Sequence, residues 1–215
     1  MIINHNRTVN PDPYKIYNKM LRGDEVYDHE IEYLNGKYSV VRPKDNLDLR
    51  RIVLFYNNYC PEDSLDWLDV SMITTMDYLF SYTHFNGSIY TWNVSRVRSM
   101  AEMFHLSQFN NNISCWNVSN VTDMRSMFSR AQFNGDISGW DVSNVKNMTA
   151  MFFDNSFFNQ DISAWDVSNV ESFALMFQDS VFNHDISNWD VSNGYTTDMF
   201  KNCPINEKYK PAYFR

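Results

Sequence analysis

The sequence is poor in residues that break or cross-link a chain. It contains six glycines, six prolines and three cysteines among 215 residues. So little glycine and proline argues against a collagen-like or low-complexity disordered protein. The three cysteines, Cys60, Cys115 and Cys203, are odd in number, far apart and form no CxxC pair, so they predict no disulfide framework. We expect buried or partly buried thiols in a reducing compartment, including Cys115 beside Trp116.

Targeting signals and long apolar runs are also missing. The start, MIINHNRTVNPDPYK, has no basic segment followed by an apolar run of the kind found in signal peptides. No apolar stretch approaches the roughly 18–20 residues needed to cross a bilayer. These features predict a soluble, cytoplasmic protein without membrane insertion. For a viral protein, the host cell or the virion would be the location.

Basic excess and catalytic motifs are absent as well. The formal net charge is −8, so the repeats described below should repel a phosphate backbone, and we expect no nucleic-acid partner. There is no phosphate-binding glycine loop and no nucleophile motif. The histidines form no metal-binding pattern; they are His5, His29, His84, His105 and His184. We therefore predict a non-enzymatic protein with no cofactor, no catalytic residues and no metal ligands.

What the sequence does contain is a repeat. Six tryptophans recur every 24 or 25 residues, and apolar columns recur with them. The tryptophans are Trp67, Trp92, Trp116, Trp140, Trp165 and Trp189. Fixed apolar columns at such a period are typical of stacked repeats. The sequence predicts an α/β repeat solenoid, leucine-rich-repeat-like, with about six coils of 24–25 residues.

Each coil should have two parts. In the third unit, Val121, Met124, Met127 and Phe128 follow helical spacing, which predicts a short helix or helical turn. Residues 136–143, DISGWDVS, alternate apolar and polar side chains, which predicts a short parallel strand around the tryptophan. Methionine and phenylalanine stripes at this spacing are far more often core than a ligand groove. We therefore expect them to be buried between coils.

The flanking segments should cover the ends of the stack. Residues 1–43 are expected to contain an arm, a short helix at 13–21 and a β-hairpin about Asn35-Gly36. Residues 44–65 should form a capping helix, residues 66–203 the solenoid and residues 204–215 a C-terminal cap. An independent domain in residues 1–43 is the alternative.

The unit resembles the BspA-like repeat of the leucine-rich-repeat class, in the form first noted in mycoplasma surface lipoproteins, FNxDISxWDVSNVxxMxxMF. The matching segments are FNGDISGWDVSNVKNMTAMF at 133–152 and FNQDISAWDVSNVESFALMF at 158–177. The resemblance covers about residues 66–203. It implies an adhesion or interaction protein, and it carries over no catalytic residue, since the family shares none.

Acidic columns are the features least explained by packing. One column follows the Phe-Asn pair and the other follows the tryptophan; they hold Asp136, Asp161 and Asp185, and Asp141, Asp166 and Asp190. Stacked carboxylates repel one another unless they accept turn N–H groups, bind a cation or meet a basic partner. Capping of turn amides is the simplest interpretation. A basic protein partner and Ca²⁺ remain alternatives.

These observations predict a protein–protein interaction module that presents an elongated repeat surface to a protein partner, possibly a basic one. A structural or surface component of a virus particle or cell, adhesin-like, is the alternative. Positions that vary from coil to coil should locate the binding face. They are Tyr82, His84, Arg96, Arg98, His105, Arg125, Arg130, Gln132, Lys146 and Glu171.

Overall fold

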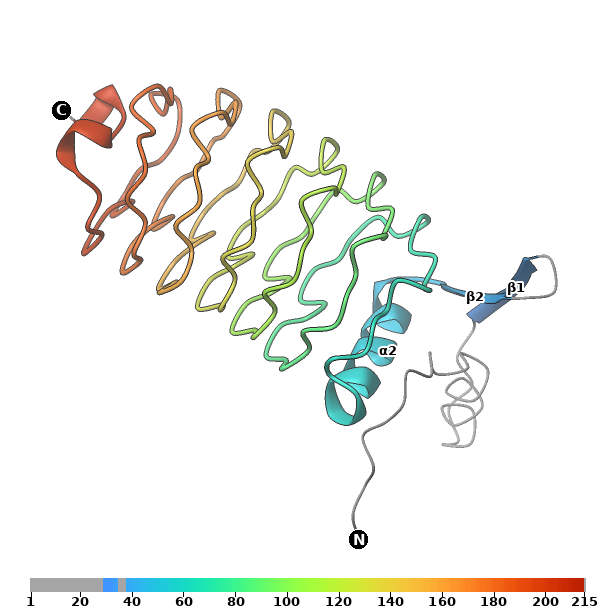
Figure 1. Cartoon of the computed structure of the whole chain (residues 1–215). Helices are drawn as coiled ribbons and strands as arrows, with labels where there is room; N and C mark the ends of the chain where they lie inside the picture. The colour runs from blue at the N-terminus through green and yellow to red at the C-terminus, as the bar shows by residue number, and fades with distance from the viewer. Residues whose placement is uncertain (1–28, 35–37, 215) are drawn as a thin grey trace, which may run out of the picture.

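The computed structural model describes residues 29–34 and 38–214. Its regular elements lie at the two ends of the chain, and the repeats lie between them as successive units stacked side by side (Figure 1). The predicted short helix at 13–21 and the Asn35-Gly36 turn fall outside the described residues. Strands β1 (His29–Leu34) and β2 (Tyr38–Pro43) pair antiparallel, with His29 opposite Pro43.

Helix α2 (Asn46–Tyr59) is capped at its N-terminus by Asp45, whose carboxylate accepts the backbone N–H of Asp48 at 2.9 Å. Asp at an N-cap satisfies one of the free donors of the first helical turn. The helix buries one apolar face, which consists of Leu49, Ile52, Val53 and Tyr56. Ring contacts between Tyr56 and Trp67, at 6.1 Å, join that face to the first unit.

The core of the stack consists of the recurring apolar columns, as the sequence predicts. Phenylalanines of successive units lie nearly parallel, with ring centroids 5.3 Å apart for Phe80 and Phe104 and 5.5 Å apart for Phe104 and Phe128. These rings are fully buried. Each such ring stabilises the stack by roughly 1.5–3 kcal/mol through burial alone.

The units are joined by a backbone ladder that is not built from strands. In the first unit the N–H groups of Met76, Tyr78, Phe80 and Tyr82 donate at 2.8–2.9 Å to carbonyls of the second unit. The acceptors are Ser99, Ala101, Met103 and His105. The alternate residues between these donors form local turns; for example, Leu79 N–H donates to the Met76 carbonyl at 3.2 Å. Every N–H group of this segment that points along the stack therefore points toward the C-terminal end.

The secondary structure inside the units differs from the expectation. Residues 66–203, all of which are described, contain no helix and no strand of two or more residues, only single parallel bridges such as Thr75 with Ser99. A helix has a diameter of about 10 Å, whereas parallel strands lie about 4.8 Å apart. Directly stacked units leave no room for a helix in each, so the methionine segment forms turns instead.

Those turns use backbone conformations that side chains seldom adopt. Two residues per unit have positive φ, four positions apart, such as Ser126 at 53° and Arg130 at 56°. The second position of each unit forms a column that we call the left-handed row: Tyr82, Leu106, Arg130, Asp154, Asp179 and Asn202. The conformation is set by the ladder and recurs whatever side chain is present.

Side chains add two further ladders between units. The asparagine after the buried phenylalanine accepts a backbone N–H from the matching asparagine of the next unit: Asn134 N–H donates to Asn110 Oδ1 at 2.8 Å, and Asn159 N–H donates to Asn134 Oδ1 at 2.9 Å. The indole N–H groups of Trp92, Trp116, Trp140 and Trp165 donate to a carbonyl of the preceding unit, as Trp140 does to Ile113 at 3.2 Å. These bonds explain why both residues recur.

The chain after the sixth unit turns into two short 3₁₀ helices, η1 (Glu207–Tyr209) and η2 (Ala212–Phe214). Phe214 meets Phe200 edge-on, with ring centroids 5.1 Å apart. Ile186 N–H donates to the carbonyl of Tyr209 at 3.0 Å. This segment therefore covers the apolar part of the last unit.

Candidate functional site

From the sequence, the acidic columns are the strongest candidates for chemistry beyond packing, and the cysteines are expected to be buried or partly buried thiols. All three cysteines are free, and Cys115 is exposed, so the expectation of a buried thiol there is wrong. The residues at the equivalent place before four other tryptophans are exposed as well, namely Thr91, Gly139, Ala164 and Asn188. The Cys115 thiol donates to the carbonyl of Tyr90 at 3.1 Å, and no histidine is paired with it among the described residues.

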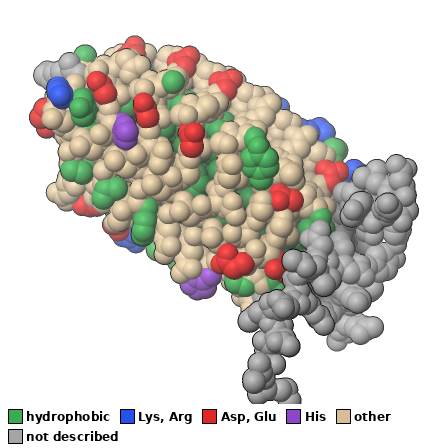
Figure 2. All heavy atoms as spheres, viewed as in Figure 1, with side chains coloured by type: hydrophobic (Ala, Val, Ile, Leu, Met, Phe, Trp, Pro, Cys, Tyr) green, Lys and Arg blue, Asp and Glu red, His purple; other side chains and the backbone are tan. Residues whose placement is uncertain are grey.

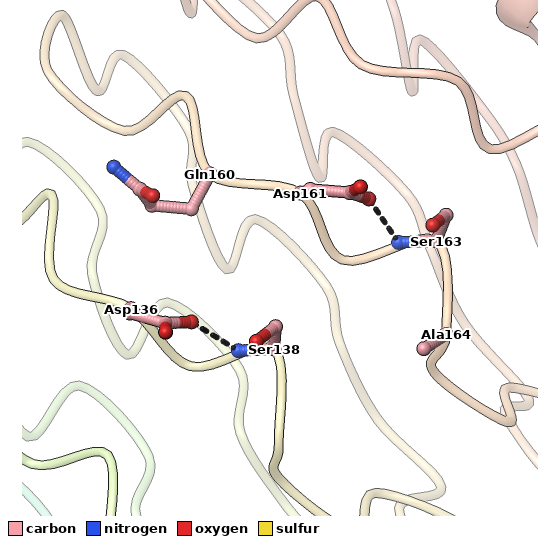
Figure 3. Close-up of a pocket in the computed structure, with 6 residues that line it drawn as sticks. All are labelled: Asp136, Ser138, Gln160, Asp161, Ser163 and Ala164. Carbon is pink, nitrogen blue, oxygen red and sulfur yellow. Dashed lines mark hydrogen bonds between the residues drawn. The ribbon is translucent and has the colours of Figure 1, made fainter.

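The acidic columns cap turns. Asp136 and Asp161 line a surface hollow together with Gln160 (Figure 3). Each carboxylate accepts the backbone N–H of the serine two residues later, at 2.9 Å for Ser138 and 2.9 Å for Ser163. The backbone bond, followed by the bond from the serine hydroxyl, lowers the pKa of both aspartates.

The second acidic column behaves in the same way. Asp141 accepts the hydroxyl of Ser143 at 2.6 Å and its backbone N–H at 3.1 Å, and these two bonds lower its pKa. Asn117 makes the equivalent bonds to Ser119 without a charge. Within the described residues no group of three or more His, Cys, Asp or Glu side chains could hold a metal ion. On the face shown in Figure 2, acidic side chains are scattered over a mostly uncharged surface.

The predicted binding residues fall into two sets. Arg96, Arg98, Lys146 and Glu171 lie in the turns after the tryptophans. Lys146 Nζ lies 3.6 Å from Glu171 Oε1 in the next unit, and the Arg96 guanidinium contacts the sulfur of Met72 at 3.2 Å. Backbone hydrogen bonds also join these turns between units; for example, Arg98 N–H donates to the Thr74 carbonyl of the preceding unit at 2.8 Å.

The other set lies in the turns between the two buried phenylalanines of each unit, such as Phe80 and Phe85, and here the side chains meet. The rings of Tyr82 and His105 pack edge to face with centroids 5.3 Å apart. Arg130, one unit further, donates to Asp154 Oδ2 at 3.0 Å, and its guanidinium lies over the ring of Phe153 at 5.5 Å. Burial, followed by the charge of Arg130, lowers the pKa of the His105 imidazole, although Glu102 opposes the shift.

Three predicted residues border this second set. His84 lies toward helix α2, where its backbone N–H donates to Asn57 Oδ1 at 2.6 Å. Gln132 is exposed and joins the preceding unit through its backbone N–H to the Ser107 carbonyl at 3.0 Å. Arg125 lies beside Tyr78, whose hydroxyl raises the Arg125 pKa more than the nearby Asp123 does.

Two further residues belong to this surface but were missed from the sequence. Tyr78 and Leu106 are 42% and 38% exposed, and both have positive φ, at 61° and 53°. Positive φ disfavours bulky side chains and favours Asn and Asp. The equivalent of Leu106 in the sixth unit is Asn202, which suits the conformation without an apolar side chain. Comparing side-chain size among equivalent positions of the six units would have identified both residues, because Tyr78 corresponds to Asp198 and Leu106 to Asn202 in the sixth unit.

A family model described as "Mycoplasma protein of unknown function, DUF285" matches the chain over residues 51–137 and again over 130–211. The two matched regions together include part of helix α2, all six tryptophan units and most of the C-terminal segment. Neither the curated proteins nor the solved structures contain a match. Among the described residues, no helix is both long enough and apolar enough to span a bilayer.

Proposed function

Because the chain belongs to the family described as "Mycoplasma protein of unknown function, DUF285", a repeat family, we propose that it is a non-enzymatic interaction module that binds a protein partner along its repeats. We further propose that its stacked units form a leucine-rich-repeat-like solenoid of the BspA-like type. Support for this class comes from the 24- or 25-residue period, the parallel bridges between units and the matched family.

The observation that carries the proposed function is the side-chain content of the left-handed row. At its N-terminal end the row carries Tyr82, 69% exposed, and Leu106, 38% exposed. At its C-terminal end it carries Asp179 and Asn202, which tolerate positive φ. Bulky exposed residues in this conformation cost of order 1 kcal/mol each without adding to the core. Tyr82 and Leu106 are therefore better explained by contact with a partner than by the stability of the stack.

The chemistry of the row suits an interface core. Tyr and Arg are the residue types most enriched among energetically important interface positions. Tyr82 and Arg130 are both exposed and lie in the first and third units, with His105 between them. The lowered pKa of His105 keeps its ring neutral at neutral pH, so the centre of this surface can be desolvated at modest cost.

A triple variant tests the proposal without endangering the fold. In Tyr82→Asn/Leu106→Asn/Arg130→Asn, each new side chain is one that positive φ favours, and Asn202 already occupies the equivalent place. We expect the variant to keep its urea midpoint and to lose the proteins that the wild type retains from native lysate. The matched control is Arg98→Asn/Lys146→Asn/Glu171→Gln in the turns after the tryptophans, which should retain them. Retention of the same proteins by the triple variant would reject this face.

A further inference from the structure

The last unit carries a row of backbone donors that the ladder leaves without acceptors. In the fifth unit, N–H groups at four alternate positions donate to carbonyls of the sixth unit at 2.8–2.9 Å; they belong to Phe173, Leu175, Phe177 and Asp179. The equivalent groups of the sixth unit belong to Thr196, Asp198, Phe200 and Asn202. In the described chain, no oxygen accepts a hydrogen bond from any of these four N–H groups.

Side chains around this row are open to solvent. In the fifth unit, Ala174, Leu175, Gln178 and Asp179 are half-buried. Their equivalents in the sixth unit are all exposed, namely Thr197, Asp198, Lys201 and Asn202. Phe214 covers the ring of Phe200, but residues 203–214 supply no acceptor to the row. The apolar end of the stack is covered, whereas its hydrogen-bonding edge is not.

The direction of the ladder determines what this edge can bind. All four groups are donors, so a second copy of this chain cannot pair through the same edge, because donors would face donors. The opposite end cannot serve either, since Asn46 and Arg50 of helix α2 already donate to its carbonyls. The complementary partner is a chain that offers a row of free main-chain carbonyls.

We propose that the C-terminal edge of the stack binds a polypeptide segment of another protein, whose alternate carbonyls accept hydrogen bonds from Thr196, Asp198, Phe200 and Asn202. Segments added to an open backbone edge gain affinity from main-chain hydrogen bonds, and side chains then set specificity. Each ladder between successive units of this chain is an example of the required geometry. The site lies at the end of the stack and is independent of the surface proposed above.

The probe is a synthetic peptide with the sequence of residues 171–181, ESFALMFQDSV. In the stack, its alternate carbonyls accept the N–H groups of Met148, Ala150, Phe152 and Asp154, at 2.8–2.9 Å. We expect saturable binding to the full chain, with slowed amide exchange at the four donors of the sixth unit. A scrambled peptide should neither bind nor slow exchange.

Thr196→Pro removes one donor that makes no hydrogen bond to any described residue, and Thr196→Ala keeps that donor. We expect Thr196→Pro to weaken peptide binding by about fivefold relative to Thr196→Ala, corresponding to one lost hydrogen bond. Unchanged amide protection at Phe173 and Phe177 would show that the variant keeps its ladder. An ester in place of the amide after Ala174 of the peptide weakens one acceptor and should reduce binding in the same way.

Absence of binding at millimolar peptide would overturn the proposal, as would equal binding by the proline and alanine variants. Protection confined to residues outside the sixth unit would overturn it too. The Tyr82→Asn/Leu106→Asn/Arg130→Asn variant should bind the peptide as the wild type does. A failure here and a failure of the proposed interaction surface are therefore distinguishable.

Discussion

The two ends of the stack are completed in different ways. At the N-terminal end, the backbone presents carbonyls, and side chains of helix α2 donate to them: Asn46 Nδ2 to Asp77 at 3.0 Å, and Arg50 Nη1 to Leu79 at 2.9 Å. Arg50 also reaches the carbonyls of Tyr78 and Ser81. At the C-terminal end the backbone presents N–H groups; η1 and η2 cover neighbouring apolar side chains, and the Tyr209 carbonyl accepts the Ile186 N–H, but within the described residues neither helix supplies an acceptor to this row.

This difference follows from the direction of the ladder. Because the segment equivalent to residues 76–82 donates forward in every unit but the last, its carbonyls in the first unit need donors and its N–H groups in the last unit need acceptors. An arginine and an asparagine are suited to the first task, since both carry several N–H donors at the end of a side chain. A stack of directional units thus needs two chemically different caps, and for this segment the chain supplies side-chain donors at its N-terminal end, to the carbonyls of Asp77, Leu79 and Ser81.

The largest expected effect comes from removing the apolar part of the N-terminal cap. Tyr56 is fully buried against Trp67, so Tyr56→Ala should lower the free energy of unfolding by about 3–5 kcal/mol. Phe214→Ala, at the half-buried C-terminal cap, should cost less than about 2 kcal/mol. Urea unfolding followed by tryptophan fluorescence measures both. Equal losses at the two ends would contradict the comparison.

Tyr56→Phe is the control for the first variant. The Tyr56 hydroxyl is buried and has no hydrogen-bond partner among the described residues, and burial raises its pKa, so the group stays protonated. Its removal deletes no bond and relieves an unsatisfied polar atom. We expect stability to be unchanged or raised by up to about 1 kcal/mol. A loss comparable to that of Tyr56→Ala would show that the hydroxyl has a partner.

The polar part of the N-terminal cap should have a smaller effect. Arg50→Ala leaves the carbonyls of Leu79 and Ser81 without their donor, which should cost about 1–3 kcal/mol. The loss should be local, with faster amide exchange in the first unit and little change in the fifth. Arg50→Lys keeps the charge with fewer donors and should fall between wild type and alanine. An unchanged urea midpoint for Arg50→Ala would refute the capping role.

The smallest effect concerns acid and the second acidic column, which holds Asp141, Asp166 and Asp190 in the last three units; the equivalent positions in the first three units are Asp69, Asn93 and Asn117. The folded pKa values of Asp141, Asp166 and Asp190 are lowered by the serine hydroxyls, followed by the serine backbone N–H groups. Their contribution is therefore complete above the unfolded carboxyl pKa of about 3.9 and is lost as pH falls through the lower folded values.

Asp141→Asn keeps an oxygen that accepts the Ser143 N–H but replaces the titratable carboxylate by a neutral amide, the arrangement that Asn117 has with Ser119 in the preceding unit. We expect a change within about 0.5 kcal/mol at pH 7 and a smaller loss of stability between pH 5 and pH 2. Urea midpoints across that range measure both quantities. An acid loss equal to that of the wild type would mean that the serine bonds do not lower the Asp141 pKa.

Much of the molecule follows from the period of its apolar residues. Val121, Met124 and Phe128 recur because each packs on its equivalent in the next unit, so their burial could be predicted from one sequence. The helical face of Leu49, Ile52 and Val53 could be predicted for the same reason. Helical spacing of Val121 and Met124 was misleading, since turns with positive φ at Ser126 produce the same apolar pattern.

The candidate binding surface was harder to predict, because it depends on which turns of neighbouring units bring their side chains into contact. Variation among units identified Tyr82, His105 and Arg130, and in the structure His105 lies between the other two, with its ring against that of Tyr82. The same variation also selected Arg96 and Lys146, which lie in another turn. Leu106 was missed because an apolar residue in a variable turn resembles core until its positive φ and its exposure are known.

Amide hydrogen exchange of the fifth and sixth units tests the central claim most directly. If the ladder is directional and open at its C-terminal end, the N–H groups of Phe173, Leu175, Phe177 and Asp179 should be strongly protected. Those of Thr196, Asp198, Phe200 and Asn202 should exchange at least about tenfold faster, because they lack acceptors. Equal protection of the two rows would contradict the account.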